Sequence, residues 1–108
     1  MTAEGSAIAN SERGEAVLEV AGVPRLLRPT FTALVAAEDE LGPLFALVER
    51  AGAGELRLSE IAALFWHCLA DRDAIGREAV GEAVVALGLA ASAKPLRVLL
   101  RQILQGAG

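Results

Sequence analysis

One stretch of this sequence, between two predicted helices, has the composition of a calcium-binding loop. In a twelve-residue calcium loop, acidic residues take the first, third and last positions and glycine takes the sixth. The residues that match are Asp71, Asp73, Gly76 and Glu82. The fifth position is Ile75, which supplies no oxygen, whereas a calcium site needs about six to eight oxygen ligands. The sequence therefore favours a metal-free turn, with a calcium site on Asp71, Asp73 and Glu82 as the weaker alternative.

Nucleophilic or hydrolytic chemistry has three candidate residues, Ser59, His67 and Cys68. A triad draws its members from different elements and needs an oxyanion hole, and the chain has no G-x-S-x-G motif. His67 and Asp71 have the spacing of neighbours on one helix face, so we expect them to pair. Cys68 falls on an apolar helical stripe, where a buried thiol is inert. The sequence predicts no catalytic residue, no metal ion and no cofactor.

An acidic run ends the first predicted helix at Glu38, Asp39 and Glu40. Glu38 lies on the apolar stripe of that helix, and a carboxylate at the edge of a core usually has a cationic partner. We expect that partner to be Arg28 or Arg13. We expect the side chains of Asp39 and Glu40 to face solvent.

Surplus apolar side chains point to a protein-binding surface. Hydrophobic residues make up 54% of the chain, and a chain of 11.2 kDa has limited interior volume. Contiguous apolar patches left on a surface usually mark partner sites, and tryptophan is enriched in them. The candidate partner-binding residues are Phe45, Val48, Leu64 and Trp66.

The elements that position these residues follow from spacing. Two short apolar runs around Gly22 predict a β-hairpin over residues 15–28. Apolar side chains at helical spacing then predict five helices, which begin near Thr30, Pro43, Ser59, Arg77 and Ser92. The predicted fold is mainly α, with a small N-terminal β-hairpin followed by a compact bundle of four to five short helices. Residues 1–12 are expected to be a flexible leader, and residues 13–105 a single domain.

Composition excludes several classes of partner. The net charge of −4 argues against nucleic acid, because its binders usually carry a basic face. The uncharged stretches 61–70 and 83–93 are shorter than the ~18 apolar residues of a membrane span. The N-terminal residues lack the charged and apolar regions of a signal peptide. We therefore expect a cytoplasmic protein that binds neither nucleic acid nor membrane.

Several short motifs, taken in order, resemble the gene transfer agent family of phage-tail proteins. They begin with the Arg-Gly-Glu run at residues 13–15 and the glycine turn at Gly22. The pattern T-x-x-A-L-x-x-x-E-x-x-L-G follows at Thr30–Gly42, then a Leu-Ser helix from Leu58 and a leucine-rich C-terminal helix. The resemblance covers about residues 13–104. Proteins of this family are encoded beside the tape measure gene of gene transfer agents and tailed prophages.

The resemblance implies a non-enzymatic factor in virion assembly, specifically a tail assembly chaperone. Such a chaperone binds the tape measure protein before the tail tube polymerises and prevents its apolar helices from aggregating. The tail tube protein and a second copy of the chain are further candidate partners, and association with the finished particle is left open. Two alternatives remain: a degenerate, EF-hand-like helix–loop–helix binding module, and a cytosolic helical adaptor unrelated to phages.

Overall fold

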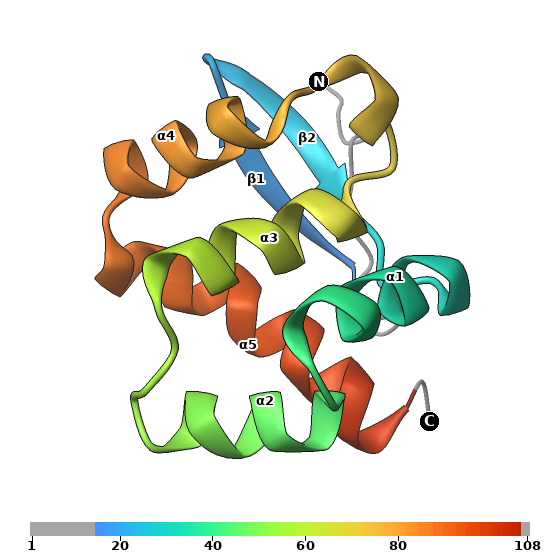
Figure 1. Ribbon diagram of the computed structural model, residues 1–108. Coiled ribbons are helices and arrows are strands. Elements are labelled where there is room, and N and C mark those ends of the chain that lie inside the picture. Colours follow the sequence, from blue (N-terminus) through green and yellow to red (C-terminus); the bar gives the residue numbers. More distant parts are fainter. Residues whose placement is uncertain (1–14, 107–108) are drawn as a thin grey trace.

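The structure is a computed structural model that describes residues 15–106. Its elements are β1 (Ala16–Val20), β2 (Val23–Leu27), α1 (Phe31–Leu41), α2 (Leu44–Gly52), α3 (Leu58–Cys68), the 3-10 turn η3 (Arg72–Ala74), α4 (Arg77–Leu87) and α5 (Leu89–Gln105) (Figure 1). The predicted fold class, a small hairpin followed by five helices, is confirmed. The leader expected over residues 1–12 lies outside the described residues.

The hairpin closes through a two-residue turn at Ala21 and Gly22. Both residues have positive φ values, 53° and 82°, as a tight turn between right-twisted strands requires. Glycine adopts this conformation without steric cost. Along β1 the side chains of Ala16, Leu18 and Val20 are buried and the intervening ones are exposed. The hairpin therefore presents one apolar face to the helices.

Three helix boundaries follow the sequence signals closely. The Thr30 hydroxyl accepts a hydrogen bond from the Ala33 N–H at 3.1 Å and caps α1, as expected. Gly42 ends α1 with a φ of 89°, and Gly88 ends α4 with a φ of 93°. Because only glycine adopts such angles freely, these two positions fix where the chain changes direction.

Ser59 and Ser92 lie near the expected helix starts but do not cap α3 and α5. Helix α3 begins one residue earlier, where a Glu60 carboxylate oxygen accepts a hydrogen bond from the Arg57 N–H at 2.9 Å. Helix α5 begins at Leu89, so Ser92 is a buried residue of its first turn and Pro95 lies inside the helix. The reason is that Gly88 alone turns the chain, and the alanine-rich segment that follows it favours helix.

Helix α3 runs through the middle of the molecule, with α1 and α4 packed against it (Figure 1). Strand β1 of the hairpin packs against α4 and α5. Each main element places at least one side chain in the core, including Leu18, Leu27, Ala37, Leu47, Phe65, Val84 and Leu99. Burying a leucine or phenylalanine side chain contributes roughly 1.5–3 kcal/mol. The shared core therefore stabilises elements that are too short to be stable alone.

The C-terminal end of α3 is attached to the hairpin by backbone hydrogen bonds. The Arg28 N–H donates to the Cys68 carbonyl oxygen at 2.6 Å, and the Ala70 N–H donates to the Leu26 carbonyl oxygen at 3.0 Å. This short antiparallel pairing extends β2 by one bridge. It fixes the position of the segment that leads into η3 and α4.

Helices α4 and α5 meet at a sharp angle. No single helix among the described residues is long and apolar enough to cross a membrane. The two helices reach the length and composition of a span only when taken together, and they are bent by 119° relative to each other. Both contribute fully buried side chains, Val84 and Leu99, to the core.

Candidate functional site

The four predicted partner-binding residues lie in different environments. Phe45, in the first turn of α2, is 70% exposed, and Val48 on the same helix is half-buried. Leu64 is fully buried in the core, so the expectation that its side chain is available to a partner is wrong. It lies on the inward face of α3, with Phe65 and Cys68. Contact of a partner with Phe45, Val48 or Trp66 stays a prediction.

Trp66 is half-buried and holds the connection between α3 and α4. Its indole N–H donates to the Ile75 carbonyl oxygen at 2.8 Å. The Arg77 guanidinium lies 4.5 Å from the centre of the indole ring, and that of Arg72 lies 5.7 Å from it. Such cation–π contacts contribute about 0.5–1 kcal/mol at exposed positions. The Trp66 side chain therefore has a structural role within the chain.

A cluster of charged groups joins α1, α3 and α4 through Glu40. The Arg77 guanidinium donates to Glu40 at 2.6 Å, and the His67 Nε2 lies 2.8 Å from a Glu40 oxygen. Hydrogen bonds from Arg77 first, and then from His67, lower the pKa of the Glu40 carboxyl to about 2. Glu40 is therefore an ionised and paired group. The side chain of Glu40 is exposed, as expected, but it is also paired. The expectation that His67 pairs with Asp71 is wrong, because His67 bonds to Glu40.

The remaining acidic residues have other partners than those predicted. Glu38 accepts a hydrogen bond from the Leu44 N–H at 3.1 Å, at the start of α2. Arg28, one of its two expected partners, forms an ion pair with the buried Glu15 at 3.0 Å instead. Arg13, the other expected partner, lies outside the described residues. Thus Glu38 caps a helix, because the chain reverses directly after α1.

The residues of the calcium alternative do not form a ligand set. Asp71 pairs with Arg25 at 2.7 Å, Asp73 lies in η3, and Glu82 projects from α4. Over residues 15–106 the structure contains no group of three or more acidic, histidine or cysteine side chains that could hold a metal ion. Ile75, at the fifth loop position, is buried against the core. The geometry of the segment is that of a turn between α3 and α4.

Cys68 is a buried residue at the end of α3. Burial raises the pKa of its thiol to about 12, because a thiolate is poorly solvated there. Since the thiolate is the nucleophile, the thiol is unreactive near neutral pH. This agrees with its predicted place on the apolar stripe.

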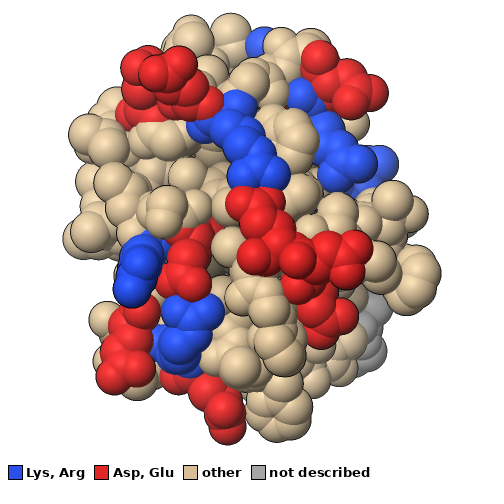
Figure 2. Space-filling model, in the orientation of Figure 1, with Lys and Arg blue, Asp and Glu red and all other residues tan. Residues whose placement is uncertain are grey.

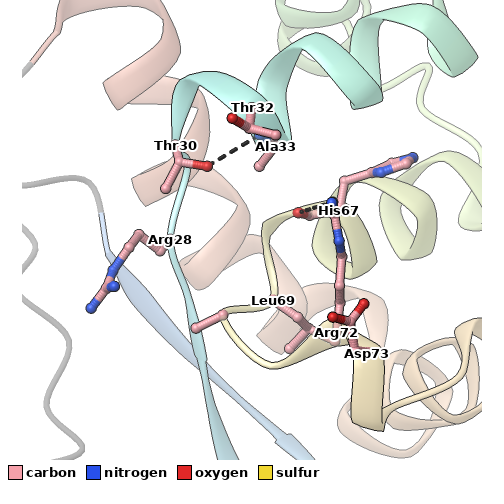
Figure 3. A pocket seen from close by; sticks show the side chains of 9 residues that line it. Arg28, Thr30, Thr32, Ala33, His67, Leu69, Arg72 and Asp73 are labelled. Carbon is pink, nitrogen blue, oxygen red and sulfur yellow. Dashed lines mark hydrogen bonds between the residues drawn. The ribbon is translucent and has the colours of Figure 1, made fainter.

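A polar pocket of about 300 Å³ lies where the end of β2, the start of α1 and the end of α3 meet (Figure 3). Two of its polar side chains bond to the protein itself. Thr30 caps α1, and an Arg72 N–H donates to the His67 carbonyl oxygen at 3.3 Å. In Figure 3 the Arg28 side chain points away from Arg72 across the pocket.

A larger hollow, of about 520 Å³, lies between α3 and α4. We call it the α3–α4 groove; it is lined by Leu58, Ser59, Ala62, Glu78, Gly81, Glu82, Val85 and Ala86. Val85 is 64% exposed, and Leu58 is exposed as well. Figure 2 shows this part of the molecule as an uncharged surface at the left, with acidic side chains along its upper edge.

Sequence reasoning missed the groove because small residues define it. Ala62, Gly81 and Ala86 carry no charge, ring or ligand atom, so their types gave no signal. The available signal was Val85, an apolar residue outside the stripe formed by Val80 and Val84 on α4. A single exposed apolar side chain is common, but an apolar patch that spans two neighbouring helices often marks a surface that a partner covers.

Comparison with known proteins gives one match. Residues 13–106 match the model of the family described as "phage tail tube protein, GTA-gp10". No curated protein and no solved structure gave a significant match. The family match covers the hairpin and all five helices, and therefore both the charged cluster around Glu40 and the α3–α4 groove.

Proposed function

Because this chain belongs to the phage tail tube protein family GTA-gp10, we propose that it is a tail assembly chaperone. In this role it binds the tape measure protein before the tail tube polymerises. It shields apolar helices of that protein from aggregation and then yields them to the growing tube. Its work is therefore non-enzymatic and takes place in the cytoplasm of the bacterial host.

The observation that carries the proposal is the apolar surface that this small fold leaves uncovered. The exposed large hydrophobic residues are Val17, Val23, Phe31, Val35, Phe45, Leu58, Val85, Leu87, Leu89 and Leu104. Scattered exposed leucines are ordinary, but the α3–α4 groove is a continuous apolar surface. A chaperone for apolar helices needs such a surface, and the net charge of −4 favours solubility of the complex.

Three of the side chains that could take part in catalysis are paired or buried here. His67 bonds to Glu40, Asp71 pairs with Arg25, and burial raises the pKa of Cys68 to about 12. A nucleophile or a general base needs a free lone pair that faces a substrate. These engagements support a binding function over a catalytic one.

Co-expression with the tape measure protein tests the proposal. We expect the two proteins to co-purify, and the soluble fraction of the tape measure protein to increase several-fold. Phe45→Ala should weaken retention, because an exposed aromatic anchor often dominates an interface. Phe31→Ala is the matched control and should leave retention unchanged, because Phe31 is also exposed (83%) but lies on α1, outside the residues predicted to bind the partner. If the wild-type protein neither retains nor solubilises the tape measure protein, the chaperone function is refuted.

A second candidate function follows from the family description, which names a tail tube protein. In that case the chain is a component of the particle. Mass spectrometry of purified particles separates the two functions, because a tube component is present in many copies per tail. A chaperone is found with the unassembled tape measure protein and is depleted from finished particles.

The alternatives from other classes have their own tests. Trp66 is the chain's only tryptophan, so a calcium titration followed by its fluorescence tests the EF-hand-like module. Micromolar binding that is lost in Asp71→Ala would favour that module. The neighbouring genes test the adaptor: a long tape measure gene nearby favours the tail function.

A further inference from the structure

We propose that the α3–α4 groove binds an amphipathic helix whose apolar ridge is flanked by lysine or arginine side chains. The inference rests on the proposed function, since it identifies the segment of the tape measure protein that the chaperone recognises. It concerns a surface other than Phe45 and Trp66.

The floor of the groove fits the side-chain ridge of a helix. Ala62, Gly81 and Ala86 have the smallest side chains, so a second backbone can approach α3 and α4 closely there. Leu58 and Val85 stand exposed beside them and offer apolar contacts. Helices pack by placing the ridge of one into the groove of another. A third helix laid along this groove would cover apolar surface that is in water in the free protein.

The charges at the groove determine which side chains should flank the apolar ridge of the bound helix. Glu78 and Glu82 both line it, one helical turn apart on α4. Like charges at this spacing repel each other, and a cation beside them relieves the repulsion. In the part of the chain that the structure describes, neither carboxylate forms an ion pair, whereas Glu40, Glu60 and Asp71 do. A partner with lysine or arginine beside its apolar ridge supplies the missing cations.

A second copy of this chain offers one competing occupant, the outer face of α5. Lys94, Arg97 and Arg101 lie on that face and have the right charge for the groove. Beside them the only apolar side chain of the same hollow is Val98, which is half-buried. An apolar groove gains little from a face that is mostly charged, because burying charges requires desolvation. We therefore assign the groove to the tape measure helix.

Gly81 provides a way to fill the groove without disturbing the fold. A Cβ atom added at Gly81 meets nothing within 4 Å, so a larger side chain fits there and projects into open space. Leucine also favours the helix more than glycine does. Gly81→Leu should thus fold normally while occupying the docking site. Gly52→Leu, at the end of α2, is the matched control, because its Cβ likewise meets nothing within 4 Å.

Two synthetic peptides test the chemistry of the occupant. Both are helices of about 18 residues with the same leucine–alanine ridge, flanked by lysine in one and glutamate in the other. We expect the wild-type protein to bind the lysine peptide about tenfold more tightly, and less so as salt increases. The double variant Glu78→Gln, Glu82→Gln should remove this preference. The control pair Glu49→Gln, Glu55→Gln should keep it.

The same variants are then tested with the tape measure protein. Gly81→Leu should reduce its retention about tenfold or more, and Gly52→Leu should leave it unchanged. If Gly81→Leu retains the tape measure protein as the wild type does, the groove is not its docking site, while the chaperone function stands. If the wild type retains none, the chaperone function itself is refuted.

Analytical ultracentrifugation distinguishes binding of α5 from a second copy from binding of a tape measure helix. If the wild type self-associates at micromolar concentration and both Gly81→Leu and Arg97→Glu restore the monomer, the groove binds α5 of a second copy. That result would overturn the assignment to the tape measure helix. A monomeric wild type that prefers the lysine peptide supports it.

Discussion

Helices α3 and α4 present two contrasting regions. Toward α1 they carry the charged cluster in which Arg77 and His67 both contact Glu40, with Trp66 beneath the Arg77 guanidinium. On their other side lies the α3–α4 groove, which is apolar and has two carboxylates at its edge. A neighbouring element of the same chain covers the first region by supplying Glu40. Over the described residues, no helix or strand covers the second.

The two regions of this helix pair therefore have different roles: the charged cluster stabilises the fold, and the groove is available to bind a partner. Contacts around Glu40 are made inside the protein, so changes there alter the free energy of unfolding. Contacts at the groove are incomplete in the free chain, so changes there should alter binding and leave the fold intact. Predictions that compare the two regions with the core between them test this division.

The largest loss of stability is expected in the core that separates the two regions. Leu64 is fully buried, and a leucine-to-alanine change at such a position costs about 2–5 kcal/mol. Urea denaturation should show this loss for Leu64→Ala. Leu58→Ala, on the exposed edge of the groove, should cost well under half as much. Equal losses for the two variants would contradict the placement of Leu64.

A smaller loss is expected for Trp66→Phe in the charged region. The change removes the indole N–H that donates to the Ile75 carbonyl oxygen and weakens the contact with Arg77. Together these interactions contribute about 1–2 kcal/mol. Thermal unfolding followed by circular dichroism measures the effect. Phe31→Leu serves as the surface control and should remain within about 0.5 kcal/mol of the wild type.

Next comes Glu40→Gln, whose effect should depend on pH. The pKa of Glu40 is lowered from about 4.5 to about 2 in the folded protein, chiefly by Arg77. The ion pair therefore stabilises the fold fully above pH 4.5 and progressively less as the pH falls toward 2. The side chains are partly solvent-exposed, so the difference at pH 7 should be about 1 kcal/mol. Denaturation of both proteins between pH 7 and pH 2.5 tests this, and an unchanged difference would contradict it.

The sequence allowed the hairpin and the helix order to be predicted because their signals are local. Gly22, Gly42 and Gly88 each require a positive φ, and the apolar stripes repeat at the spacing of a helix. The contact between Glu40 and His67 joins residues 27 apart in the chain, and that between Arg25 and Asp71 joins residues 46 apart. The chain has fourteen acidic residues, any of which could pair with a given cation. Spacing in the sequence identifies only pairs one helical turn apart, so it could not predict these long-range pairs.

The failures at Leu64 and in the groove have a different origin. Leu64 is predicted at a partner surface because an apolar stripe in the sequence does not show which of its members faces the core; in the structure Leu64 is fully buried. Which members face the core is decided by the packing of several elements together. The groove depends on Ala62, Gly81 and Ala86, whose small side chains create space that only the neighbouring helix defines.

The smallest effect on stability is expected for Val85→Ser. Comparing it with Val84→Ser tests most directly whether the groove and the core have different roles. The two valines are neighbours on α4, but Val84 is fully buried and Val85 is 64% exposed. Burying a hydroxyl without a partner and losing methyl groups should cost Val84→Ser about 2 kcal/mol or more. Val85→Ser should stay within about 0.5 kcal/mol of the wild type.

Binding should show the opposite order, because Val85 lies at the groove and Val84 lies in the core. The lysine-flanked peptide should bind Val85→Ser several-fold more weakly than it binds the wild type. Folded Val84→Ser, measured well below its unfolding temperature, should bind with nearly unchanged affinity. Isothermal titration measures the peptide affinity of both variants, and circular dichroism of the same samples checks that they are folded. If Val85→Ser binds the peptide like the wild type, the outer face of α4 does not contact the bound helix. The proposed division between a stabilising region and a binding region would then be wrong.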